Sequence, residues 1–203
     1  MRARGFAILP MIAIIGLSAG CRKNVVDQGA FKSALNDYYS GRQECLWASP
    51  LKFPVQADTS NDEQTREFDA LTDAGLLTRT SAEKKRFLIG SKQVNNYDLS
   101  EKGRSAWTAD QTQPGYGNFC IGHPEVTTID AFTPVDDSSA TQYRVNYHYS
   151  VSGVPAWAST TEMKTAFEKV AADTSGQQTA TANLAKGSNG WQVVTVRGAV
   201  PRS

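Results

Sequence analysis

The chain has 203 residues, of which 40% are hydrophobic and 20% charged, with 21 Lys and Arg against 20 Asp and Glu. This composition is typical of a globular protein with one ordinary domain or two small ones, and it excludes a chain that is disordered over most of its length. The nearly neutral charge argues against a nucleic-acid partner, because binding nucleic acid usually requires an excess of basic side chains on one face.

Residues 1–20 have the pattern of a secretory signal peptide. Arg2 and Arg4 form a basic head, and no residue from 5 to 17 is charged. The apolar run is too short to cross roughly 30 Å of hydrocarbon as a helix, and Pro10 interrupts it. We therefore expect residues 1–20 to be removed after export.

The apolar run ends in Leu17-Ser18-Ala19-Gly20-Cys21. This segment resembles the lipobox of bacterial lipoproteins, with Ser18 where that family usually has leucine. The resemblance implies that Cys21 carries a diacylglyceryl group, that cleavage occurs before it, and that its amine is acylated by a fatty acid such as palmitate. Arg22 is not the Asp that retains lipoproteins at the inner membrane, so the resemblance implies the outer membrane, facing the periplasm, if the cell is Gram-negative. An ordinary signal peptide with an incidental Cys21 is the alternative.

The cysteines support an oxidising compartment. If the Cys21 sulfur carries the lipid, Cys45 and Cys120 remain as an even pair, and such a pair predicts a disulfide in an exported protein. Closing a loop of about 75 residues would stabilise the fold by roughly 4 to 5 kcal/mol in the chain-entropy model. Two buried free thiols are the alternative.

The first half of the chain is predicted to be mainly helical. Residues 21–30 form a tether, and apolar residues at helical spacing predict a helix from about Asp27 to Ser40, ended by Gly41. The spacing Ser60-Asn61-Asp62-Glu63 predicts the start of a second helix, which ends at Gly75. The segments 76–80, 87–89 and 97–99 are compatible with strands, and Ser100 can cap a short helix that runs through Trp107.

The order of these elements over roughly residues 60–107 resembles a winged helix. The resemblance is carried by Leu71-Thr72-Asp73-Ala74-Gly75-Leu76-Leu77 and by Tyr97-Asp98-Leu99-Ser100-Glu101-Lys102-Gly103. It implies that Gly75 marks the turn after the recognition helix and that Leu77 and Tyr97 lie in the two strands of the wing. Because the chain carries an export signal, such a module would be a packing or protein-contact unit.

The second half is predicted to be rich in β-structure. Tyr143, Val145, Tyr147, Tyr149 and Val151 alternate with polar residues, as in an antiparallel strand with one covered face. Further strands are predicted at 119–121, 126–132, 179–184 and 191–196. The spacing Ser159-Thr160-Thr161-Glu162 opens one helix that ends near Gly176, and Asn189-Gly190 predicts a tight hairpin turn.

We therefore predict an α+β fold in which an N-terminal helical part, with the winged-helix-like segment, precedes an antiparallel sheet with one packed helix. Residues 31–110 would form a mainly helical subdomain and residues 118–200 a β-rich subdomain, divided by the linker 111–117. A single domain over 31–200 is the alternative.

The sequence shows little catalytic chemistry. It has two histidines, and Cys120-x-x-His123 lacks the second ligand pair that a zinc site needs. It also lacks the glycine-rich phosphate loops and the nucleophile elbow of known enzyme classes. We predict no catalytic residue, metal ligand or cofactor. Cys120 with His123 or His148 and Glu125 is the one nucleophile arrangement that the residue types allow.

The candidate binding surface consists of Arg144, Asn146 and His148, on the polar side of their strand, and Trp157, which follows it. The alternatives are a solvated sheet face and a tryptophan packed under the next helix. The sequence favours a lipid-anchored envelope protein that binds a partner protein or an envelope component. An envelope hydrolase or modifying enzyme, whose site forms only in three dimensions, is the alternative.

Overall fold

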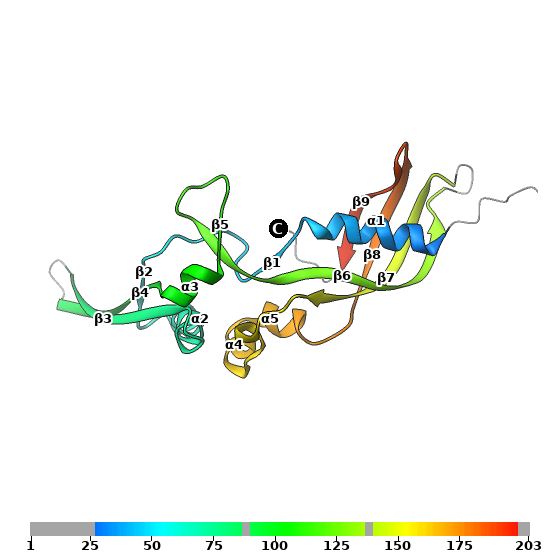
Figure 1. Ribbon diagram of the computed structural model, residues 1–203. Coiled ribbons are helices and arrows are strands. Elements are labelled where there is room, and N and C mark those ends of the chain that lie inside the picture. The colour runs from blue at the N-terminus through cyan, green and yellow to red at the C-terminus, as the bar shows by residue number, and fades with distance from the viewer. Residues whose placement is uncertain (1–26, 87–89, 137–139, 199–203) are drawn as a thin grey trace, which may run out of the picture.

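The computed structural model describes residues 27–86, 90–136 and 140–198. Cys21, the predicted signal peptide and the predicted strand at 87–89 lie outside the described residues. The fold is α+β, with mixed helices and two antiparallel sheets (Figure 1). Within the described ranges, no helix combines the length and the apolar character that crossing a membrane requires.

The larger sheet curls into a half-barrel around helix α1 (Figure 1). Its main path follows the order β1-β6-β7-β8-β9, and β5 also pairs with β6. The strands are β1 Glu44–Cys45, β5 Trp107–Ala109, β6 Gly117–Pro134, β7 Gln142–Ser152, β8 Gln178–Gly187 and β9 Gly190–Gly198, and each pairing is antiparallel.

Helix α1, Gln28–Ser40, confirms the first predicted helix. The Asp27 side chain accepts a hydrogen bond from the backbone N–H of Gly29 at 2.8 Å, which caps the helix, and Gly41 ends it. The helix buries Phe31 and Leu35 completely against the inner face of the half-barrel. Burial of such side chains contributes about 1.5 to 3 kcal/mol each, and this apolar stripe holds the helix in place.

Two polar side chains of α1 bind the edge of β6 that β7 leaves free. The Asn36 side chain accepts a hydrogen bond from the backbone N–H of Val126 at 2.8 Å, and the Lys32 ammonium donates to the Thr127 carbonyl at 2.8 Å. These bonds satisfy backbone groups that would otherwise be open to another strand.

Strands β6 and β7 form the centre of the half-barrel. The predicted alternation in β7 is confirmed, because Tyr143, Val145, Tyr147 and Tyr149 are all buried against α1. The strands predicted at 119–121 and 126–132 are parts of the single strand β6. Irregularities in the pairing near Thr127 and Asp130 bend β6 without ending it.

The smaller sheet has the order β2-β4-β3, from Val55–Asp58, Gly90–Leu99 and Leu77–Arg86. Helix α2, Asp62–Asp73, packs on it and buries Phe68 and Leu71. The protein has two hydrophobic cores. The first lies between α1 and the half-barrel. The second contains Phe68 and Leu71, the first part of β6 and the helices near the end of the chain.

The winged-helix resemblance is not supported, because no winged helix is evident in the fold. Among the described residues, one helix, α2, lies between β2 and β3, and α3, Glu101–Ala106, follows the hairpin. Gly75, with φ +75°, turns the chain directly from α2 into β3. The quoted leucines and glycines are therefore ordinary signals of a helix end and a strand start.

One helix start and one turn differ in detail from the predictions, and a second helix start agrees. Asn61 caps α2 by accepting a hydrogen bond from the backbone N–H of Gln64 at 3.2 Å, in place of Ser60. Ser100 caps α3 as predicted, by accepting from Gly103 N–H at 2.8 Å. The last hairpin turns at Ser188–Asn189, one residue earlier than predicted, since Gly187 pairs with Gly190.

The helix predicted after residue 160 is divided. A short 3₁₀ helix, Ala156–Ser159, precedes α4, Thr161–Ala166, and α5, Glu168–Asp173. Phe167 has an extended backbone between α4 and α5, and its ring lies 6.1 Å from that of Trp47 in the second core. Packing of this ring into the core thus accompanies the break in the helix.

Candidate functional site

Strand β6 contributes to both cores, and in its first half a disulfide joins Cys45 of β1 to Cys120. The predicted disulfide is therefore confirmed. With both sulfurs in this bond, no thiolate is available on Cys120, which removes the one nucleophile arrangement that the residue types allowed. β1 has two residues, and the chain after it stays on β6 through a Leu46 N–H bond to the Phe119 carbonyl at 2.9 Å.

An open groove with a volume of about 670 Å³ lies beside the disulfide. Gly117 pairs with Ala109 of β5 and also exchanges two backbone hydrogen bonds with Leu51, so β5 and the β1 segment lie on opposite edges of β6. The groove is lined from both edges by Ser40, Gly41, Arg42, Gln43, Cys45 and Pro50, by Thr108, Ala109, Asp110 and Gln111, and by Gly117, Asn118 and Cys120. Its lining combines polar and apolar surface in nearly equal parts, and the two cysteines of the disulfide belong to it.

Each wall carries one charged side chain with a fixed orientation. One Asp110 oxygen accepts hydrogen bonds from the Thr112 hydroxyl and backbone N–H, both at 2.7 Å, and from Gln113 N–H at 2.8 Å. The Thr112 bonds, with a smaller contribution from Gln113, lower the pKa of Asp110, which favours its charged form. On the other wall the Arg42 guanidinium lies 3.9 Å from the centre of the Tyr38 ring. The lining of the groove therefore includes one basic residue on one wall and one acidic residue on the other.

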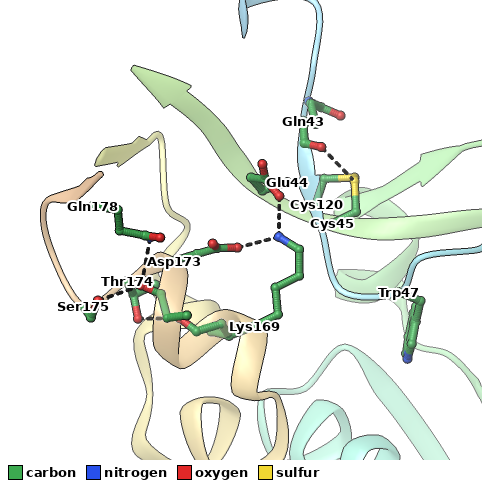
Figure 2. A network of polar contacts seen from close by, with 12 residues as sticks. Gln43, Glu44, Cys45, Trp47, Cys120, Lys169, Asp173, Thr174, Ser175 and Gln178 are labelled. Carbon is green, nitrogen blue, oxygen red and sulfur yellow. Dashed lines mark hydrogen bonds and ion pairs between the residues drawn. A yellow bond between two sulfur atoms is a disulfide. The ribbon is translucent and has the colours of Figure 1, made fainter. Parts of the chain in front are cut away.

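A largely buried ionic network holds the residue that precedes the groove residue Cys45. Figure 2 shows the Lys169 ammonium between the carboxylates of Glu44, which precedes Cys45, and Asp173. Lys169 donates to Glu44 and, at 2.5 Å, to Asp173. Glu44 is 7% exposed and Asp173 4%, so the lysine is what compensates two buried negative charges. The network fixes α5 against β1.

Three tyrosines lie next to this network. Desolvation by burial raises the pKa of Tyr39 to about 12, and burial also raises the pKa of Tyr147 and of Tyr149. The nearby carboxylates of Glu44 and Asp173 add to the effect at Tyr149. All three hydroxyl groups are therefore uncharged at neutral pH, as a buried cluster requires.

The structure brings three of the four predicted surface residues together. Arg144, Asn146 and His148 lie on the outer side of β7, where the His148 Nδ1 is 2.7 Å from a carboxylate oxygen of Asp130. The Thr181 hydroxyl donates to the Asn146 side chain at 2.8 Å. None of these residues lines the groove.

Trp157 is separate from that surface. Its half-buried ring lies 5.9 Å from the ring of Phe119 and packs against the second core, in agreement with the packing alternative. The groove residues Arg42 and Asp110 and the bracing Lys169 carry no pattern that singles them out in the sequence. The predicted disulfide was the one signal that could have placed residues 43–45 beside 118–120.

Among the described residues, no group of three or more His, Cys, Asp or Glu side chains is arranged to hold a metal ion. Comparisons with protein-family models, with curated proteins and with solved structures find no match for this chain.

Proposed function

We propose that the protein is a lipid-anchored component of the cell envelope that binds a partner protein or another envelope component in the groove beside the disulfide. The observation that carries the binding role is the groove itself, which has about 670 Å³ of open volume between two walls that both carry polar residues. Concave sites with a few oriented polar groups are the usual places where proteins bind ligands.

The walls of this groove are held in position before any ligand arrives. The disulfide and the Lys169 network fix β1, and the Asp110 loop is fixed by its own hydrogen bonds. A site whose walls are already in place loses little conformational entropy on binding, which favours affinity. Arg42 and Asp110 would orient a ligand that carries complementary charges or hydrogen-bonding groups.

The envelope location rests on the lipobox-like segment that ends at Cys21 and on the disulfide, since disulfides persist in oxidising compartments. Two or three acyl chains would make the attachment stable, whereas a single chain would be marginal. The intact mass of the mature N-terminus tests this part. An unmodified Cys21 thiol, or the absence of cleavage before it, would disprove the anchor.

Photo-crosslinking in intact cells tests the groove. A photoreactive residue in place of the exposed Gln43 or Gln111 samples the two walls, and one in place of the exposed Asn146 samples the outer face of β7. We expect the same adduct from both wall positions, reduced when Arg42→Ala and Asp110→Ala are combined, and no such adduct from position 146. An adduct from position 146 alone would place binding on the outer face and refute the groove.

One observation favours an enzyme as the second candidate. The contact between His148 and Asp130 is a histidine oriented by a carboxylate, which is an arrangement used in general acid–base catalysis. It lies on the outer face of the sheet, and neither residue lines the groove beside the disulfide. Turnover of an envelope ester or amide by the purified protein, abolished by His148→Ala, would favour this candidate over binding.

A further inference from the structure

Three segments of the chain meet where α1 begins. The Phe31 ring lies 5.4 Å from the Tyr143 ring and 4.9 Å from the Trp191 ring. Tyr143 and Trp191 are the strand residues next to the β6–β7 connection and the β8–β9 turn. The Lys186 N–H donates to the Thr141 carbonyl at 2.8 Å and joins these two connections. We call this end of the half-barrel, formed by residues 27–29, 135 and 186–189, the basal end.

The basal end and the groove lie at opposite ends of α1. The helix has 13 residues and is therefore about 20 Å long at 1.5 Å per residue. Its last residue, Ser40, and the following Arg42 already line the groove. Figure 1 shows that the smaller sheet lies still farther from the start of α1, beyond the groove segments.

The proposed anchor lies close to the basal end along the chain. Residues 22–27 are the whole connection between Cys21 and α1, so Cys21 and Gln28 are seven residue steps apart, which at about 3.5 Å per step span at most roughly 25 Å. The start of α1 must therefore remain within that distance of the lipid. The connection is only slightly longer than α1, so the groove stays off the bilayer when α1 points away from it.

From this geometry we infer that the basal end rests on the surface of the bilayer and that the groove is held away from it. The inference depends on the proposed lipid anchor and adds the identity of the membrane-facing surface. Val135, 46% exposed at this end, is an apolar side chain that the headgroup region would cover, and the exposed Lys186 can extend its ammonium toward lipid phosphates. The groove then opens toward partners that stand off the membrane.

Headgroup quenching tests this orientation. The full-length lipidated protein, with its native disulfide intact, carries one fluorophore on Ser188→Cys at the basal end or on Gln111→Cys at the groove. Both positions are exposed. In phosphatidylethanolamine–phosphatidylglycerol vesicles with a quencher on the headgroups, we expect at least threefold stronger quenching at position 188. Equal quenching, or stronger quenching at position 111, would overturn the orientation.

A longer connection provides a second test. A flexible insertion after Lys23 should weaken quenching at position 188 while the protein still floats with the vesicles. Unchanged quenching at that position would mean that the tether does not position the basal end, and would overturn the inference. Flotation and intact mass are measured on the same samples, so an unlipidated protein that fails to float would refute the proposed anchor itself and is distinguishable from a lipidated protein in another orientation.

Discussion

The hydroxyl groups of Tyr39 and Tyr147 lie 2.5 Å apart in the buried space between α1 and β7. Each hydroxyl is the other's hydrogen-bond partner, and both rings are at most 1% exposed. A buried polar group is tolerated only when it is hydrogen-bonded, so this pair links the position of the helix to the register of the strand.

Tyr39→Phe should lower the free energy of unfolding by about 1 to 3 kcal/mol, because it leaves the Tyr147 hydroxyl buried without a partner. The double variant with Tyr147→Phe should cost clearly less than the sum of the two single variants, because both polar groups are then gone. Denaturant unfolding of the four proteins measures this coupling. Simple additivity would contradict the hydrogen bond.

Alkaline pH should destabilise the protein through the same tyrosines. The pKa of Tyr39 is raised from 10.0 to about 12 by burial, so the folded protein holds this proton more tightly than the unfolded chain. The resulting stabilisation is fully present below pH 10 and is lost as the pH rises toward 12. Unfolding measured across this pH range should show the decline, and phenolate absorbance should show tyrosines that ionise late. Ionisation of all seven tyrosines together near pH 10 would argue against the buried cluster.

Replacing Lys169 by Met should destabilise the protein by about 3 kcal/mol, since it leaves two buried carboxylates without a cation. Lys186→Met, at an exposed position, is the matched control and should change stability by less than about 0.5 kcal/mol. Thermal or denaturant unfolding compares the two variants. If both variants have the same stability, the ionic network has no part in holding α5 against β1.

Loss of the disulfide should have a large effect on stability. Replacing Cys45 and Cys120 together by Ala should cost about 2 to 5 kcal/mol, because the bond closes a loop with a sequence separation of 75. Thiol titration of the mature protein in denaturant should find no reactive thiol before reduction and two after it. Two reactive thiols before reduction would show that the bond is absent from the native protein.

Local patterns predicted most of the elements, whereas their arrangement depended on distant contacts. The helix from Asp27 to Ser40 and the alternation around Tyr147 were visible because each has a repeating apolar period and, for the helix, a cap. The break at Phe167 could not be predicted, because the local pattern favoured one continuous helix. The extended residue accompanies a ring contact with Trp47, which is far away in the sequence.

The candidate site was less predictable for the same reason. Arg42 and Asp110 are ordinary polar residues in connecting segments. Both line the same groove only because β6 pairs on both of its edges. Lys169 comes from the last third of the chain to reach Glu44. A single sequence contains the cysteine pair that indicates this proximity, but it contains no signal for the charges that gather around it.

Strand β6 passes through both cores without interruption over 18 residues. Its first half packs with the helices near the end of the chain, and its second half packs with the helix at the beginning. Neither core can unfold without removing contacts from β6, on which the other core also depends. The molecule should therefore unfold cooperatively, as one thermodynamic unit with a single calorimetric transition.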